Sequence, residues 1–317
     1  MIACGDRSGT ISIYSILSNK MEVSFSGHEA EITVLEFVRV GGQLILASGG
    51  RDRKINIFDA SESDDTKKFD FIQRLDDHTS TVTAIVFSSQ GLYFASASAD
   101  KSVVFRKLVN PEGSLIEYRS FRRISLRSAV YDMKIYDTTT VLTANQDRKL
   151  MYINLITGEV ERSIIPSLPG HVANVHGASV TSFCTLHDLN LLAICSSDKS
   201  LRLIGEKTGV IQTEKFGHGD LITDVINLGN NRLASSTGDG CIFVWKVTSN
   251  ESIVNSQSNV ATIESPTDDP SIATVQLSPF LKIIDKDLPV WARADASERD
   301  LRQEVAVPVK GRWAEVI

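Results

Sequence analysis

An acidic turn followed by a short β-branched strand recurs six times, and this repeat constrains the fold more than any other feature of the sequence. The turns follow one another at intervals of 44, 48, 47, 51 and 41 residues. A period of about 40–45 residues is typical of chains built from repeated four-stranded sheets. The six turns start at Ser8, Asp52, Asp100, Asp147, Asp198 and Asp239.

A second pattern, His-x-x-x-[Ile/Val]-Thr, precedes four of these turns by 21 to 24 residues. Between each histidine and its aspartate, an apolar stretch of strand character ends in small residues that include a serine. The histidines are His28, His78, His176 and His218, and the serines are Ser48, Ser96, Ser196 and Ser235. Two patterns in one register predict a β-propeller blade repeated along residues 1–248.

The arrangement resembles the WD-repeat family. The resemblance implies an all-β WD40 β-propeller in which His, a small hydroxyl residue and Asp form a buried hydrogen-bonded network with the aromatic residue of the third strand, Trp245 in the last copy. A buried polar group that loses its partner costs about 1–3 kcal/mol, so such a network stabilises the blade turns.

Two copies depart from the pattern. The copy at Asp147 has Leu126 where the histidine is expected, and the first copy has only residues 1–5 before its turn. We therefore expect about five and a half visible blades, incomplete relative to the seven that are commonest in the family. Open edges of such a propeller would allow self-association.

Composition narrows the function classes. The net charge of −6 disfavours binding to nucleic acid. No apolar run approaches the roughly 20 residues of a membrane span, and the first residues have no signal-peptide pattern. The four cysteines lie far apart without a C-x-x-C pair, so we expect no structural metal. The sequence has no Walker A or dinucleotide-binding motif, so we expect no cofactor.

Several blocks resemble one branch of the family, that of mitogen-activated protein kinase-binding protein 1 and the primary-microcephaly-associated WD-repeat protein. They include Ser48–Phe58, Phe105–Arg106, Tyr131–Met133 and Gly238–Trp245. The resemblance implies a cytoplasmic scaffold whose partners are signalling kinases of the c-Jun N-terminal kinase pathway and spindle or centrosomal proteins, located at the centrosome, the spindle pole and the cytoskeleton, with the nucleus as a further compartment.

The sequence contains no catalytic motif that would argue against a scaffold. The Ser, His and Asp set recurs at blade spacing, whereas a catalytic serine is unique and lies beside an oxyanion hole, so we expect no enzyme. The alternatives are a substrate-recognition subunit of a ubiquitin ligase or chromatin complex, an RNA-binding propeller and a truncated product without function.

Residues 249–317 read as a linker and a tail with short linear motifs. Arg119 to Arg127 form either a basic patch or a solvated strand. The candidate partner-binding residues are Asp132, Asp224, Arg122, Arg123, Trp291 and Trp313. The candidate phosphorylation sites are Ser125, Ser265 and Ser278.

Overall fold

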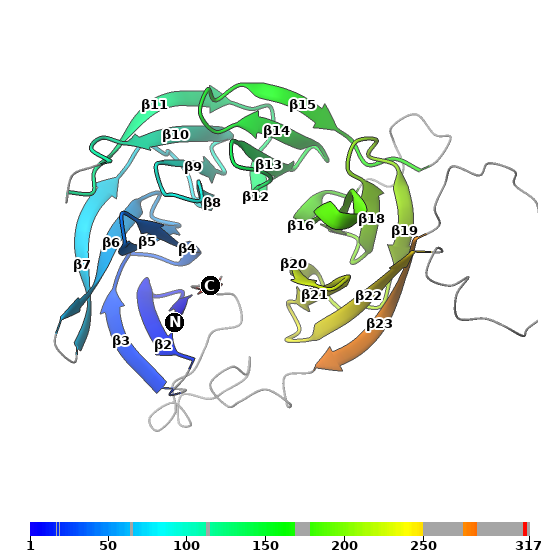
Figure 1. The fold of residues 1–317 in the computed structure, drawn as a ribbon, viewed down its shortest axis with the longest axis horizontal. Coiled ribbons are helices and arrows are strands. Elements are labelled where there is room, and N and C mark those ends of the chain that lie inside the picture. Colours follow the sequence, from blue (N-terminus) through cyan, green and yellow to red (C-terminus); the bar gives the residue numbers. More distant parts are fainter. Residues whose placement is uncertain are drawn as a thin grey trace, which may run out of the picture. The chain divides into compact units, whose positions relative to one another are not determined.

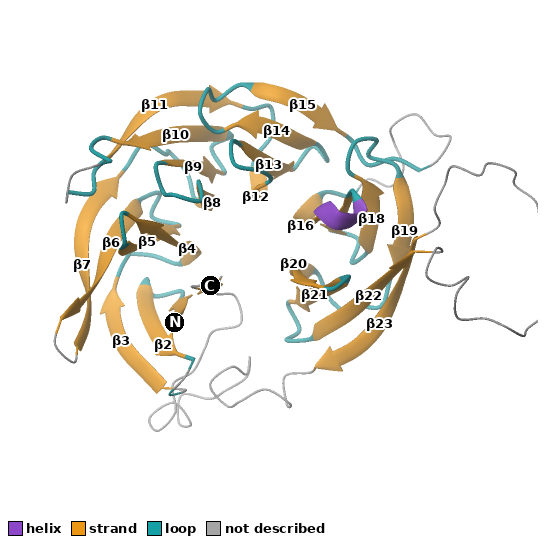
Figure 2. Cartoon of the chain, viewed as in Figure 1, coloured by secondary structure: helices purple, strands orange, loops and turns teal. Residues whose placement is uncertain are grey.

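The computed structural model describes residues 1–16, 18, 20–63, 66–111, 115–168, 178–249, 275–283 and 313–315. The chain divides into two compact units, one formed by Met1–Ser163 with Leu288–Ile317 and the other by Ile164–Asp287. The described residues form four-stranded antiparallel sheets and one short 3-10 helix (Figures 1 and 2). The expectation of an all-β fold built from four-stranded blades is confirmed. No helix in these ranges is long and apolar enough to cross a membrane.

The described residues of the first unit form four sheets. Three are meanders of consecutive strands, and the fourth combines the first three strands of the chain with a strand near its C-terminal end. The strands are β24 (Trp313–Glu315), β1 (Ile2–Gly5), β2 (Thr10–Ser15) and β3 (Lys20–Ser26); β4 (Ile32–Val40), β5 (Gln43–Gly50), β6 (Ile55–Ser63) and β7 (Thr66–Leu75); β8 (Val82–Phe87), β9 (Tyr93–Ser98), β10 (Ser102–Leu108) and β11 (Tyr118–Ser125); and β12 (Val130–Ile135), β13 (Thr140–Asn145), β14 (Leu150–Asn154) and β15 (Val160–Ile164).

In the second unit, residues 178–249 and 275–283 form two sheets of the same kind. Along the chain, the short 3-10 helix connects the first two strands of one of them, and Figure 2 shows it beside β16 and β18. The elements are β16 (Val180–Leu186), η1 (His187–Leu189), β17 (Leu191–Ser196), β18 (Leu201–Gly205) and β19 (Ile211–Lys215); and β20 (Ile222–Gly229), β21 (Arg232–Thr237), β22 (Ile242–Ser249) and β23 (Val275–Ile283).

The burial of each strand follows from its position in the sheet. The second strands β5, β9, β13 and β17 are apolar runs buried on both faces, as in sheets covered on both sides. The last strands β11 and β15 lie at sheet edges and carry mostly exposed polar side chains. Such edges discourage pairing with other chains. The core of each unit therefore lies between successive sheets, for example around Phe87, Phe94 and Tyr118.

Strand β24 changes the interpretation of the first blade. The sequence suggested half a blade with an open edge, but β1 pairs with both β2 and β24, with Cys4 opposite Trp313 and Ile2 opposite Glu315. The expectation of an open edge at β1 is therefore wrong. The partner strand was hard to foresee because it lies about 300 residues away in the sequence.

Candidate functional site: buried blade networks and an exposed basic strand

In four copies the turn aspartate stabilises a strained backbone. The residue after the turn position has a positive φ in every copy, and in these four copies it is Arg or Lys: Arg53, Lys101, Arg148 and Lys199. A residue with a Cβ in this region is strained. The carboxylate compensates by accepting the N–H two residues on, at 3.1 Å from Lys54 to Asp52 and 2.9 Å from Ser102 to Asp100.

The first blade obtains the same turn differently. Its turn position holds Ser8, and Asp6 supplies the carboxylate instead, accepting the N–H groups of Ser8 at 2.9 Å and Thr10 at 2.8 Å. Gly9 has the positive φ of 87°. A sequence pattern that requires aspartate at the turn position therefore misses Asp6, the carboxylate that binds the turn in this copy.

The β4–β7 blade brings His28, Ser48 and Asp52 together. His28 Nδ1 lies 3.0 Å from both carboxylate oxygens of Asp52, and its Nε2 lies 2.8 Å from Ser48 Oγ. The histidine side chain is fully buried. Each polar group of the set therefore has a partner inside the protein, as buried polar groups require.

Two threonines of the sequence pattern, Thr33 and Thr181, link neighbouring blades within their own unit. Thr33 Oγ1 donates to the carbonyl oxygens of Gly49, on its own blade, and Val82, on the next. Thr181 makes the same pair of bonds to Cys195 and Ile222 at 3.3 and 3.2 Å. The sequence showed the position but not this role.

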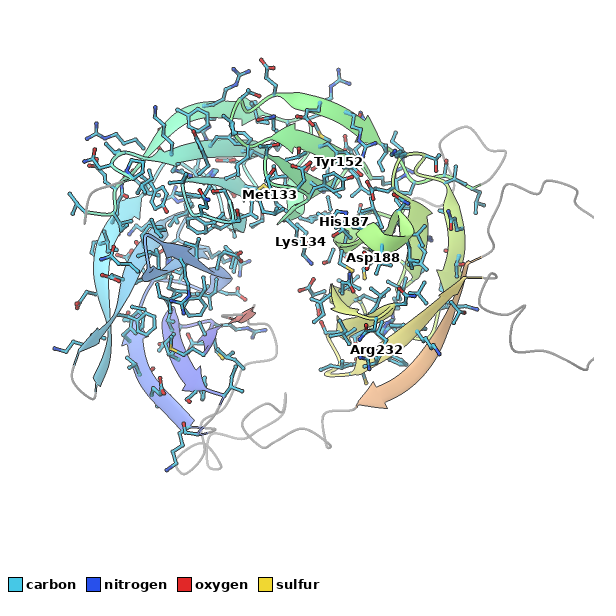
Figure 3. The ribbon with its side chains drawn as sticks, viewed as in Figure 1. Met133, Lys134, Tyr152, His187, Asp188 and Arg232 are labelled. Atoms are coloured by element: carbon cyan, nitrogen blue, oxygen red, sulfur yellow. The ribbon has the colours of Figure 1, made fainter. Side chains whose placement is uncertain are left out.

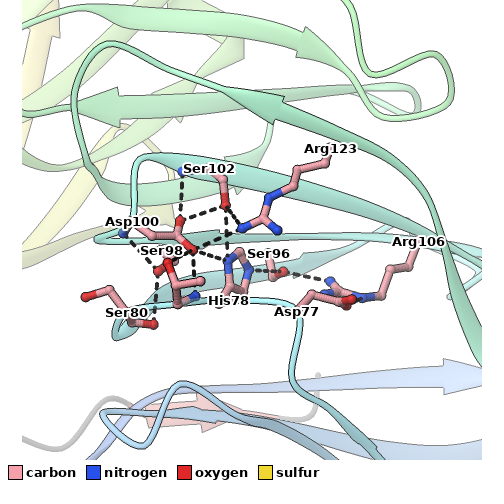
Figure 4. A network of polar contacts seen from close by, with 10 residues as sticks. Asp77, His78, Ser80, Ser96, Ser98, Asp100, Ser102, Arg106 and Arg123 are labelled. Carbon is pink, nitrogen blue, oxygen red and sulfur yellow. Dashed lines mark hydrogen bonds and ion pairs between the residues drawn. The ribbon is translucent and has the colours of Figure 1, made fainter.

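The β8–β11 blade contains the most extensive network (Figure 4). His78 Nε2 lies 2.8 Å from Ser96 Oγ, and Nδ1 lies 3.2 Å from Asp100 and 3.3 Å from the Ser102 hydroxyl. Ser102 Oγ donates to Asp100 at 2.7 Å. From the edge strand β11, Arg123 Nη2 donates to Asp100 at 3.2 Å and to Ser102 Oγ at 3.1 Å.

Arg106 occupies the place of the third-strand aromatic residue in this blade. Its side chain is 0% exposed, and Nη1 donates to Ser96 Oγ at 2.7 Å. Nε and Nη2 donate to Asp77, and the guanidinium lies 5.1 Å from the centroid of the Phe94 ring. In the sequence, Phe105–Arg106 is only one of the blocks that resemble the branch, and the sequence did not predict that Arg106 belongs to the network (Figure 4).

The network shifts the pKa values of its members. Burial lowers the pKa of His78, aided by the charge of Arg106 and opposed by Asp100, so neutral imidazole is favoured. Burial alone would raise the pKa of Asp100, but hydrogen bonds from Ser102 and from the Thr79 backbone hold it well below its usual value. The blade therefore holds an ionised carboxylate beside a neutral histidine.

The β12–β15 blade lacks the histidine. Thr143 takes the register of Ser48 and Ser96, and its hydroxyl donates to the Met151 carbonyl at 3.4 Å. Asp147 accepts the N–H of Lys149 at 3.4 Å and lies 4.0 Å from the ammonium group of the same residue. The contacts of Asp147 are therefore local, and the turn is tied to the preceding segment by the N–H of Gln146, which donates to the Ala129 carbonyl at 2.9 Å.

Asp132, a candidate contact residue, lies on β12 of the same blade. It is only 4% exposed, and it accepts the N–H of Met133 at 2.9 Å. Lys134, labelled with Met133 in Figure 3, places its ammonium 3.5 Å from the Asp132 carboxylate. The idea that Asp132 is an exposed contact residue does not agree with this burial.

The β16–β19 blade uses a different arginine. Ser196 lies opposite Val180, just as Ser98 lies opposite Val82 in the β8–β11 blade. Ser196 therefore corresponds to Ser98, two residues further along the strand than the network serine Ser96. Ser196 Oγ accepts from Arg202 Nη1 at 2.6 Å. His176 lies outside the described residues.

Arg202 joins the two acidic groups of that blade. Its Nη2 donates to Asp198 at 2.5 Å, and its Nε donates to Glu214 at 2.6 Å. The hydroxyl of Ser200 donates to the other oxygen of Asp198 at 2.6 Å. The sequence analysis missed Arg202, whose only signal is that it lies four residues after the turn aspartate, where Asn56 lies in the β4–β7 blade.

The β20–β23 blade contains the arrangement with a third-strand aromatic. His218 Nε2 lies 2.9 Å from Ser235 Oγ, and Trp245 Nε1 donates to the same oxygen at 2.8 Å. The Asp239 carboxylate accepts the hydroxyl of Thr237 and the N–H of Cys241. The serine hydroxyl is therefore the common centre of the histidine and tryptophan contacts.

The remaining candidate partner-binding and phosphorylation residues differ in exposure and in the strand that carries them. Asp224 is exposed and accepts the Ser182 hydroxyl at 2.6 Å. Arg122 and Ser125 are exposed on β11, beside the partly exposed Arg123. Trp313 and Ser278 are strand residues of β24 and β23, opposite Cys4 and Lys246 respectively, whereas Trp291 and Ser265 lie outside the described residues.

Buried serines limit the chemistry of these sets. Ser48, Ser96 and Ser235 are at most 1% exposed, so none of their hydroxyl groups can meet a substrate in this conformation. Among the described residues, no group of three or more His, Cys, Asp and Glu side chains is placed to bind a metal ion. The sets hold turns in place, and the exposed side chains around them are the groups able to contact another molecule.

Comparison with known proteins agrees with this architecture. The WD40 family model (WD domain, G-beta repeat) matches residues 19–59, 69–105, 163–204 and 209–246. The unmatched stretch between residues 105 and 163 contains the blade without the histidine. The repeat model therefore matches the described blades that carry the histidine pattern.

Full-length relatives give a finer comparison. The chain is 30% identical over 250 residues to WD repeat-containing protein 62 of Mus musculus and 31% identical to that of Sus scrofa, over 77% of this chain. It is 28% identical over 258 residues to mitogen-activated protein kinase-binding protein 1 of Mus musculus, over 80% of this chain. The chain spans about 16% of the length of these relatives.

Proposed function

Because the chain belongs to the WD-repeat family and is homologous to WD repeat-containing protein 62 and mitogen-activated protein kinase-binding protein 1, we propose that it is a non-enzymatic scaffold that presents blade surfaces to protein partners. The observation that carries the proposal is the burial of the repeated Ser, His and Asp sets. Rigid blades with variable exposed surfaces suit a binding platform.

The proposed partner class is a mitogen-activated protein kinase. One relative is named for binding such a kinase, and the resemblance in the sequence blocks extends the proposal to the c-Jun N-terminal kinase pathway and to spindle and centrosomal proteins. In this proposal the chain works in the cytoplasm and at the spindle pole during mitosis. The matched region is a small part of each relative, so these assignments come from the branch and not from a mapped binding site.

The proposed contact surface is the basic strand, which we define as Arg119, Arg122, Arg123 and Arg127 on and after β11. Arg119 is paired with Glu117 at 2.8 Å and Arg123 with Asp100. Arg122 and Arg127 are exposed. Within the described ranges neither of these two arginines forms an ion pair, so an acidic surface of a partner would meet them without first displacing a described carboxylate.

Affinity purification from dividing cells tests this function. The wild-type chain, the Arg122→Glu/Arg127→Glu variant and a control, Arg39→Glu, are compared by quantitative mass spectrometry and by imaging through mitosis. Arg39 is an exposed arginine on another strand, β4. We expect the wild type and the control to recover stress-activated kinases and spindle components, and the double variant to recover less of them. Recovery of ubiquitin-ligase or chromatin subunits in their place would overturn the proposal.

A further inference from the structure

The basic strand ends in a segment with the chemistry of a phosphorylation site. Two arginines stand three and two residues before Ser125, and an apolar residue, Leu126, follows it. Basophilic protein kinases select substrates by placing acidic pocket residues against basic side chains on this side of the acceptor. Ser120, on the same strand, has a single arginine before it and lacks this combination.

The position of Ser125 makes it accessible. Among the described strands, β11 pairs with β10 alone and is the edge strand of its sheet, and Ser125 is its last residue. Both Ser125 and Arg122 are exposed. The segment is already extended and needs only local separation at the end of an edge strand to enter a kinase cleft.

The neighbours of Ser125 connect it to the buried network. Ser125 lies directly opposite Ser102 on β10, so the two side chains project from the same face of the sheet. Arg123, two residues earlier on the same face, has its guanidinium 3.1 Å from Ser102 Oγ and 3.2 Å from Asp100. A phosphate on Ser125 would therefore lie within reach of the guanidinium that now contacts Asp100.

We propose that Ser125 is a phosphorylation site for a basophilic protein kinase and that its phosphate draws Arg123 away from Asp100, loosening the contact between β11 and the His78 turn. The kinase transfers the γ-phosphoryl group of Mg-ATP to Ser125 Oγ. The bond from the γ-phosphorus to the bridging oxygen breaks, ADP leaves with that electron pair, and the hydroxyl proton passes to the base of the kinase.

Charge favours the new contact over the old one. The phosphate carries a charge of about −1.5 to −2 and three acceptor oxygens, whereas Asp100 carries one charge and is already engaged by Ser102 and Thr79. A phosphate and a carboxylate near one guanidinium also repel each other. Two exposed cations add positive charge around the phosphate: Lys101, in the turn beside Asp100, and Arg127, two residues after Ser125.

Phosphorylation of the folded full chain tests the site. The catalytic subunit of cAMP-dependent protein kinase is the probe, and mass spectrometry counts and locates the phosphates. We expect one phosphate on the wild type and on Ser120→Ala, none at this segment in Ser125→Ala, and slower transfer to Arg122→Gln. A folded wild type that remains unmodified, or a Ser125→Ala variant labelled like the wild type, would overturn the site.

The titration of His78 tests the rearrangement. Arg123 contributes to the lowered pKa of His78, so losing its proximity should raise that pKa towards its ordinary value. We expect phosphorylation at Ser125 and the Arg123→Gln substitution to shift the His78 pKa in the same upward direction, as followed by NMR of the ring protons. A pKa that rises in Arg123→Gln but stays fixed on phosphorylation would refute the movement of Arg123.

Discussion

Replacing Arg106 tests whether an arginine has taken over the structural role of the third-strand aromatic. Its buried guanidinium makes hydrogen bonds to Ser96 at 2.7 Å and to Asp77 at 3.1 and 2.5 Å, and it lies over the Phe94 ring. Arg106→Met keeps the apolar stem and removes every one of these donors.

The expected loss is moderate because two effects oppose each other. A hydrogen bond to a charged group contributes about 1.5–3 kcal/mol, and the cation–π contact adds about 1 kcal/mol. The Asp77 side chain is 35% exposed, so water replaces part of its lost contact, and removing a buried charge recovers desolvation free energy. We therefore expect Arg106→Met to lower local stability by about 2–3 kcal/mol.

The matched rescue copies the β20–β23 blade. Phe94 lies opposite Arg106 across strands β9 and β10, as Leu233 lies opposite Trp245 across β21 and β22. The Phe94→Leu/Arg106→Trp variant provides an indole N–H for Ser96 and room for the larger ring. It should retain most of the stability that Arg106→Met loses.

Hydrogen exchange of the β9 and β10 amides is the suitable assay, because a chain with two compact units need not unfold in one step. A loss of about 2–3 kcal/mol corresponds to exchange faster by about 30- to 150-fold. Unchanged exchange in Arg106→Met, or faster exchange in the double variant than in Arg106→Met, would refute the structural role of the arginine.

Three further predictions concern other parts of the chain. Burial raises the pKa of Glu36 to about 7, so the stability that Glu36 contributes is present below its ordinary pKa and is lost as the pH rises through 7. In urea titrations, Glu36→Gln should therefore reduce the loss of stability between about pH 5 and 8. The same loss in the variant as in the wild type would contradict this role of Glu36. Deleting residues 313–317 should speed the exchange of those Ile2–Cys4 amides that are bonded to β24, whereas persistent protection would show that β24 is dispensable. Trp245→Phe should lower the free energy of unfolding by about 1 kcal/mol, because it removes the donor to Ser235. Equal stability of the variant and the wild type in urea would contradict this.

The repeat could be predicted because its signals are local. The turn aspartate, its neighbour with positive φ and the strand that follows lie within a few residues, so the period identifies the blades directly. The pairing of β24 with β1 depends on residues at opposite ends of the chain. No local pattern in a three-residue strand reveals such a partner.

The buried network was harder to predict where its members changed type. Ser196 is offset by two residues from Ser48 in sheet register, which only strand pairing reveals. Arg106 and Arg202 are buried, although arginine is mostly exposed in proteins, because each is paired with acidic side chains. Composition and periodicity alone assign such residues to the surface.

Direct binding to a kinase tests the proposed scaffold function most sharply. Isothermal titration of the purified full chain with a purified c-Jun N-terminal kinase should give saturable binding that weakens as salt rises and in Arg122→Glu/Arg127→Glu but not in Arg39→Glu. A correctly folded chain that shows no heat of binding and no co-elution with the kinase would contradict the proposal that this protein is a kinase scaffold.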